Sequence, residues 1–307
     1  MRNWKNIFIR LALIAVVICL LPSCGGLSGQ KASLPTPYPA GIRPLLLAIY
    51  HPYPDFSNLP TEVSPLPSYT GWTVHRMERD LARMRDVGFD GVLLAITPKD
   101  LANPVTVDAI GQFLALAAAP SPSSPTPTYT PAPIFKVGLL LAPSKPVTLR
   151  EENVTRYLES KNLLSFAAVL KLDGKPFIGF SEKVVLMPDP YSTCSCRLFG
   201  RDWPAMPSGQ DGGQSALGKE GVQWVRVAEH GGSSPVDWDE KTTQWPLSRR
   251  RGNAFAEGLR QAFALQARII IVSSWNNYSN GSFMEPNTLD HDEMSKVMRN
   301  ILNQHGL

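Results

Sequence analysis

The sequence IIIVSSWNNYSNGSFMEP, residues 269–286, joins a short apolar run to a loop of polar and aromatic residues. The run at 269–273 is continuous and bounded, which is typical of a buried strand. In α/β folds, ligands bind at the carboxyl ends of the strands. The loop at 274–286 therefore marks a candidate functional site, and its Asn, Tyr, Trp and Glu side chains are types that hydrogen-bond to sugars or stack on them.

Outside this stretch, predicted strands alternate with predicted helices. Apolar runs predict further strands at 45–50, 92–96, 135–141, 166–171, 176–180 and 222–228. Apolar residues at helical spacing predict helices near 74–87, 105–118, 151–163 and 253–265. Asp290 with Glu293 matches a capping box for a last helix that ends near 303. The alternation indicates an α/β protein with a parallel sheet, and residues 189–220 predict a long loop.

Part of the loop resembles the signature Trp-Asn-Glu-Trp-x-Glu-Gly-x-x-x-Glu-Pro of glycoside hydrolase family 99 and the related lipopolysaccharide-biosynthesis (WbsX-like) proteins. The matching residues are Trp275, Asn276, Gly281, Glu285 and Pro286. The segment Asp-Gly-Lys-Pro-Phe at 173–177 resembles the same family, as does the region 252–263. The resemblance implies a (β/α)8 TIM barrel formed by residues 44–307, although an eighth strand is not evident from the residues themselves.

The resemblance also implies a carbohydrate site. Members of the family are retaining enzymes that cleave mannose-containing glycans with two glutamates of the signature, and Asn277 and Asn280 stand at those positions here. An amide does not gain or lose a proton near neutral pH, but it still donates and accepts hydrogen bonds. Because one general acid or base contributes about 10²–10⁴-fold in rate, two hypotheses follow: a hydrolase with a rearranged carboxylate set, or a catalytically silent glycan-binding protein.

The candidate ligands of the glycan come from the ends of two predicted strands. They are Tyr50, His51, Trp275, Asn276, Asn277, Tyr278, Asn280 and Glu285. Glu229, which follows the strand at 222–228, is the candidate carboxylate for catalysis. Structural alternatives stand beside these roles: Trp275 as a core residue, Glu285 as the group that orients the loop, and His51 as a structural histidine.

The N-terminus predicts export. Positive charges precede an apolar run at 11–21, which is shorter than the ~20 residues that span a bilayer and is typical of a secretory signal. The sequence LPSC at 21–24 resembles a bacterial lipobox, so we expect removal of residues 1–23 and lipidation of Cys24. An ordinarily cleaved or uncleaved leader is the alternative. Residues 24–43 have the composition of a flexible linker, so we expect a membrane-anchored lipoprotein at the cell surface or on the periplasmic side.

Composition argues against several other classes. The net charge of +4 is scattered over 307 residues, with no basic stripe that would indicate a nucleic-acid partner. Cys194 and Cys196 are too few for a structural zinc site, and they predict either two free thiols or one bond between them. We expect no metal and no cofactor, since phosphate-binding motifs are also absent from the sequence. The Pro-rich stretch at 120–133 predicts a surface insertion.

Overall fold

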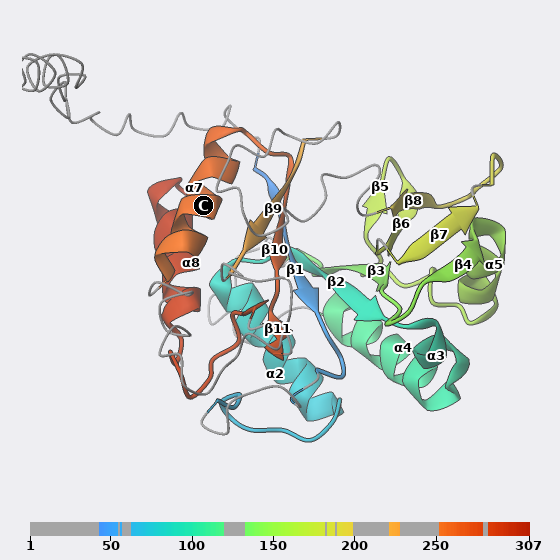
Figure 1. The fold of residues 1–307 in the computed structure, drawn as a ribbon, viewed down its shortest axis with the longest axis horizontal. Coiled ribbons are helices and arrows are strands. Elements are labelled where there is room, and N and C mark those ends of the chain that lie inside the picture. Colours follow the sequence, from blue (N-terminus) through green and yellow to red (C-terminus); the bar gives the residue numbers. More distant parts are fainter. Residues whose placement is uncertain are drawn as a thin grey trace, which may run out of the picture. The chain divides into compact units, whose positions relative to one another are not determined.

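A parallel sheet places the candidate residues. The computed structural model describes residues 43–54, 56, 63–119, 133–181, 183–187, 189–198, 221–227, 252–278 and 282–307. Within these ranges, seven parallel strands pair in the order β8-β6-β3-β2-β1-β10-β9 (Figure 1). Their bounds are β1 (Leu45–Tyr50), β2 (Gly91–Ile96), β3 (Lys136–Leu141), β6 (Lys175–Phe180), β8 (Ser195–Leu198), β9 (Val222–Arg226) and β10 (Ile269–Ser273).

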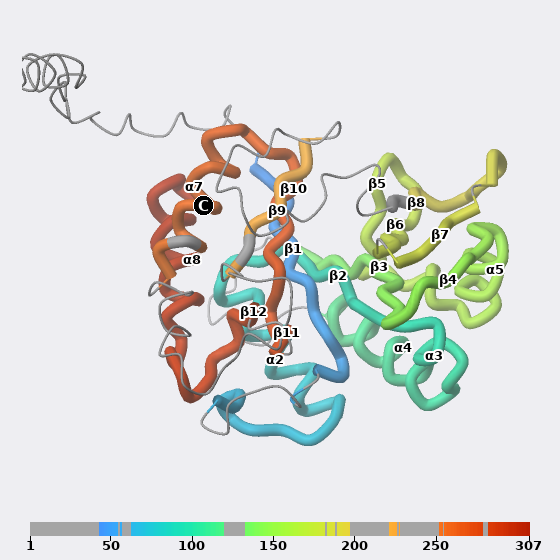
Figure 2. The backbone as a smooth tube through the Cα atoms, in the orientation of Figure 1, coloured from blue at the N-terminus to red at the C-terminus, as the bar shows by residue number. Residues whose placement is uncertain are grey.

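The sheet curls so that its last strand in sequence lies beside its first. β10 pairs with β1 from Leu45↔Ile269 to Ala48↔Val272, and the tube in Figure 2 shows the two strands side by side. In a (β/α)8 barrel the eighth strand returns to the first in the same way. β8 and β9 end the sheet and do not pair with each other in the described residues. The α/β class is confirmed, with a curled half-barrel sheet.

Helices follow the strands and cover one side of the sheet. They are α2 (Val74–Val87), α3 (Pro98–Ala102), α4 (Pro104–Ala118), α5 (Glu151–Ser160), α7 (Asn253–Ala264) and α8 (Glu293–Gln304). The ends of α2 are as predicted. The Thr73 side chain accepts a hydrogen bond from the Arg76 N–H at 3.3 Å, and Gly88 ends the helix with φ of 105°. α2 packs against α4 and α8, and α7 packs against β9 and α8.

Strand alternation divides the apolar residues between two cores. In β1, Leu47 and Ile49 belong to an interior cluster with Phe177 and Trp224. The alternate residues of β1, which end at Tyr50, belong to the larger cluster under the helices. Because successive side chains of a strand point to opposite faces, this division fixes which residues of each strand reach the interior at its carboxyl end.

Three smaller units complete the described chain. β4 (Val147–Arg150) and β7 (Val184–Met187) form a two-stranded parallel sheet. β5 (Lys171–Leu172) pairs antiparallel with β6 across the turn that contains Asp173 and Gly174. β11 (Asn276–Asn277) pairs antiparallel with β12 (Ser282–Phe283), so part of the loop after β10 is a short hairpin.

The structure corrects three local expectations. Residues 166–168 form a bend and a turn, Val169 makes one bridge to Val137, and Lys171 begins β5, because only residues 168–170 of this short apolar run are buried. Residues 195–198 form β8 inside the expected loop at 189–220. The last helix begins at Glu293 after Asp292 without a side-chain cap, because Asp290 Oδ1 instead accepts a hydrogen bond from Asn287 Nδ2 at 2.6 Å.

Several expectations lie outside the described residues. They are the leader, Cys24, nearly all of the linker at 24–43 and the Pro-rich stretch from 120 to 132. A search of the described helices finds none with the length and apolar character that a membrane span requires.

Candidate functional site

The loop after β10 folds back over the end of β1. The peptide between Ser273 and Ser274 is cis. The Trp275 N–H donates to the Ile49 carbonyl at 2.8 Å, and the Met284 and Glu285 N–H groups both donate to the Trp275 carbonyl at 2.8 Å. The start and the end of the loop are thereby tied to the same point beside β1. The loop lies at the carboxyl end of the sheet, as its place after β10 predicts.

Asn276 clamps the main chain of His51. The Asn276 Oδ1 accepts the His51 N–H at 2.8 Å, and the Asn276 Nδ2 donates to the His51 carbonyl at 2.8 Å. The Asn276 side chain is completely buried. One amide therefore satisfies both main-chain polar groups of a residue that leaves a strand end, where ladder partners have run out.

His51 is held in its neutral form. The alternation of β1 places Tyr50 among the helices, and continuing it puts His51 on the interior side of the sheet. The side chain is half-buried, and desolvation lowers the pKa of the imidazole to about 4. At neutral pH one ring nitrogen therefore donates a hydrogen bond and the other accepts one, which suits a ligand made of hydroxyl groups.

A buried ionic network behind the site holds the loop that carries His51. Tyr50 Oη donates to Asp80 Oδ2 at 2.9 Å, and Arg76 Nε donates to the same oxygen at 3.2 Å. Arg76 also donates to the carbonyls of Pro52 and Gly71, at 2.8 and 3.0 Å. Arg76 and Asp80 are both buried, so the guanidinium fixes the loop while its charge is balanced within the network.

Glu285 belongs to the same network and is completely buried. Tyr69 Oη donates to Glu285 Oε2 at 2.8 Å and Tyr278 Oη at 3.4 Å, while Arg79 Nη2 lies 3.6 Å from Oε1. Burial first, and then the negative charge of Asp80, raises the pKa of Glu285 to about 8, although Tyr69 and the two arginines act in the opposite direction. Glu285 thus joins the loop after β10 to α2.

The structure separates the predicted ligands into two groups. Tyr50, Trp275, Asn276, Tyr278 and Glu285 have no exposed surface. In this conformation they contact protein atoms; Trp275, for example, packs edge to face against Phe89 at 6.4 Å. His51 and Asn277 are partly exposed, and Asn280 and Glu229 lie outside the described residues.

Sequence reasoning missed the polar residues of α2 and the aromatic residues before it. Arg76 and Asp80 were expected only as charges between apolar positions, and their spacing of four residues, which allows a pair on one helix face, was the available signal. Tyr69 lies in a Pro-rich loop without periodicity. Its contact with Glu285 depends on tertiary structure alone.

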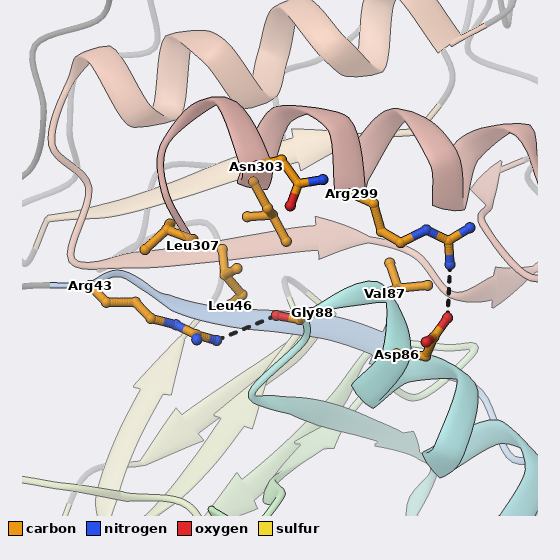
Figure 3. A pocket seen from close by; sticks show the side chains of 9 residues that line it. Arg43, Leu46, Asp86, Val87, Gly88, Arg299, Asn303 and Leu307 are labelled. Carbon is orange, nitrogen blue, oxygen red and sulfur yellow. Dashed lines mark hydrogen bonds and ion pairs between the residues drawn. The ribbon is translucent and has the colours of Figure 1, made fainter. Parts of the chain in front are cut away.

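The described residues also line two hollows at the opposite, amino end of the strands. One, of about 160 Å³, lies between α2, α8 and the start of β1, where Arg43 donates to the Gly88 carbonyl and Arg299 pairs with Asp86 (Figure 3). The other, of about 440 Å³, is lined by Leu45, Lys136 and residues 165–171. In (β/α) barrels this end contributes to stability, whereas chemistry occurs at the other end.

Cys194 and Cys196 form no disulfide in this structure. Burial is the largest cause that raises the pKa of both, so they are poor nucleophiles at neutral pH. Among the residues described, no group of three or more His, Cys, Asp or Glu side chains is arranged to hold a metal ion.

Comparisons with known proteins identify the fold. No family model matches the sequence, and no curated protein is similar to it. The chain is similar to two structures of the GH99 endo-alpha-mannosidase from Bacteroides thetaiotaomicron, one of them in complex with bis-tris-propane, with TM-scores of 0.57 and 0.53. Identity is 11% in both, and the match covers 86% of this chain and 98% of the other. The fold of this chain is therefore that of the GH99 endo-α-mannosidases, as the resemblance of its sequence predicted.

Proposed function

We propose that this chain binds glycans at the carboxyl end of its curled sheet, with His51 and Asn277 as ligands. The observation that carries the proposal is the clamp by Asn276, which holds His51 beside the signature loop by two hydrogen bonds of 2.8 Å. Preorganised hydrogen-bonding groups at strand ends are the usual basis of specificity in such sites. The similarity to an endo-α-mannosidase makes mannose-containing glycans the first substrates to test.

We propose further that binding occurs without hydrolysis by the two-glutamate route. Glycoside cleavage normally needs two carboxyl groups beside the scissile bond, and Asn277 and Asn280 occupy the matching positions. Glu285, the remaining carboxylate of the signature, is enclosed by Tyr69, Tyr278 and Arg79. The second candidate is a hydrolase that uses Glu229, which is favoured by its place three residues after the end of β9.

The test measures binding and turnover on the same protein, a truncated form that lacks residues 1–42. Calorimetry with manno-oligosaccharides should detect binding, and Asn277→Ala should weaken it. Asn303→Ala, an exposed asparagine at the amino-end hollow, is the matched control and should leave binding unchanged. Absence of binding to every glycan in a mixed panel would contradict the proposal. Turnover that disappears in Glu229→Gln would establish the hydrolase instead.

Placing glutamates at positions 277 and 280 tests whether the loop has the arrangement of the family signature. The double change Asn277→Glu with Asn280→Glu should create activity on α-mannosides at least about 10²-fold above that of the unchanged chain, since each general acid or base contributes that much or more. The double change to Gln is the control for size and polarity. Equal rates in the two variants would count against a family-like arrangement of the loop.

We also propose that the half-barrel sheet belongs to a closed (β/α)8 barrel. The return of β10 to β1 supports this closure, and so does the similarity to the endo-α-mannosidase structures.

We propose, finally, that the chain is an exported lipoprotein anchored through Cys24. The signal-like leader and the lipobox-like LPSC at 21–24 support this. In a bacterial host the full chain should partition into detergent and carry an acylated N-terminal cysteine by mass spectrometry. Cys24→Ser should abolish both, and detergent partition that is unchanged in this variant would contradict lipidation at Cys24.

A further inference from the structure

Two aromatic side chains stand exposed where the chain leaves β1. Tyr53 is 49% exposed and Phe56 is 37% exposed. They follow His51 by two and by five residues, so the chain can place them at most about 7 and 18 Å beyond it. They lie on the segment after His51, whose start Asn276 and Arg76 hold in place, and we take this segment as the rim of the proposed glycan site.

Buried or partly buried aromatic rings pack against both exposed ones. Tyr53 packs against Trp72 at 6.1 Å, with an angle of 73° between the rings. Phe56 packs against Tyr69 at 6.0 Å and against Tyr278 at 5.0 Å. These supporting rings are themselves fixed, because Trp72 Nε1 donates to Tyr50 Oη at 3.1 Å and Tyr69 donates to the buried Glu285.

The fixed rings present apolar surface at low entropic cost. A flexible side chain loses rotamer freedom when it binds a ligand, whereas these rings already pack against neighbours. The rings that back them, those of Tyr69, Trp72 and Tyr278, are aromatic and carry no charge. Such a surface fits the apolar face of a pyranose ring, which presents C–H groups to an aromatic ring.

We infer that Tyr53 and Phe56 form a stacking surface for sugar units that extend beyond the one at His51. This inference rests on the proposed glycan binding and refines it: the preferred ligand is an oligosaccharide that continues past the rim along residues 51–56. The surface acts through ring stacking, so the hydroxyl group of Tyr53 has no part in it.

The test compares a short and a long glycan probe on the truncated form that lacks residues 1–42. Methyl α-mannoside reports on the inner position, and a linear mannotetraose reports on the extended site. Tyr53→Ala and Phe56→Ala should each raise the Kd for mannotetraose by roughly 3- to 10-fold and leave the Kd for methyl α-mannoside unchanged. Tyr53→Phe should bind both probes as the unchanged chain does.

Tyr191→Ala is the matched control, because Tyr191 is 89% exposed and lies after β7. It should alter neither Kd, and circular dichroism should show that all variants are folded. The inference is overturned if Tyr53→Ala weakens both probes equally, or if Tyr53→Phe is as damaging as Tyr53→Ala. It is also overturned if the substitutions change the oligomeric state rather than binding, since the rings would then serve a contact between proteins.

The outcome separates this inference from the proposed function. Binding of both probes without any difference between the variants would remove the stacking surface and leave the glycan site standing. Failure of the unchanged chain to bind either probe would remove both.

Discussion

Two ionisable side chains at the carboxyl end of the sheet have pKa values far from their usual ones. Burial lowers the pKa of His51 to about 4, below its usual 6.5. Burial raises the pKa of Glu285 to about 8, above its usual 4.5. The contribution of His51 to stability is present above pH 6.5 and is lost as pH falls toward 4, whereas that of Glu285 is present below pH 4.5 and is lost as pH rises toward 8.

Replacing Glu285 isolates one of these contributions. In the unchanged chain the free energy of unfolding should decrease as pH rises from about 4.5 to 8, because the folded state binds a proton that the unfolded state releases. Glu285→Gln keeps an acceptor for Tyr69 and removes the titrating group, so it should flatten this decrease. Urea denaturation at pH 5, 6, 7 and 8 checks it. Equal slopes for both proteins would show that Glu285 is ionised throughout this range.

Arg76 should contribute more to the free energy of unfolding than an exposed arginine does. Arg76→Gln should lower the free energy of unfolding by about 3–5 kcal/mol, because it leaves Asp80 with one buried cationic partner fewer. Arg156→Gln removes an exposed pair with Glu152 at the same spacing and should cost at most about 1 kcal/mol. Chemical denaturation measures both changes, and a loss below 1 kcal/mol in Arg76→Gln would contradict a buried ionic network.

At the scale of elements, the sequence predicted most of the sheet. Six of the strands follow from short apolar runs, and Thr73 and Gly88 marked both ends of α2 correctly. β8 was missed because its sequence, Ser195–Leu198, contains few apolar residues and gains its place only by pairing with β6. The run at 166–171 failed for the opposite reason, since it is apolar in sequence but forms a bend and a turn with a single bridge, from Val169 to Val137.

The site was predicted less completely than the strands. The motif placed Asn276 and Glu285 at the carboxyl end of β10, where the structure has them. The direction in which each side chain points was not readable from spacing, so Trp275 and Tyr278, which are enclosed, look the same in sequence as an exposed pair would. The partners of Glu285 come from a loop and a helix about 200 residues earlier, and such contacts leave no local pattern.

The interior of the sheet depends on the absence of a side chain at one position of β3. A Cβ atom at Gly138 would lie 2.8 Å from Leu93 Cδ2 and 2.9 Å from Phe177 Cδ1. Gly138→Ala should therefore destabilise the fold by about 1–3 kcal/mol through overpacking. A Cβ atom at Gly111 in α4 would make an ordinary van der Waals contact with Phe166 Cζ at 3.9 Å, so Gly111→Ala should stabilise by about 0.5–1 kcal/mol. Thermal unfolding distinguishes the two variants. Changes of Tm with the same sign in both would contradict overpacking at Gly138.

At the scale of the whole molecule, closure of the barrel predicts how β9 exchanges its amide hydrogens. β9 pairs with β10 on one side, and its alternate N–H groups face the other side, where a closed barrel would supply a second partner strand. We expect both sets of β9 amides to be protected in hydrogen–deuterium exchange to about the same degree as those of β1, which is paired on both sides. Rapid exchange of every second amide in β9 would show an open edge.

The hydrogen bonds between Asn276 and His51 join residues 225 positions apart. β1 likewise pairs on one side with β10, a strand that comes much later in the sequence. A nascent chain leaving the ribosome therefore carries β1 with one side unpaired until β10 has been synthesised. The place where a ligand would bind does not exist until residues 276 and 277 have emerged. A truncated translation product that ends before residue 276 would lack the ligand site. If it also lacks β10, the unpaired edge of β1 would make it prone to aggregate.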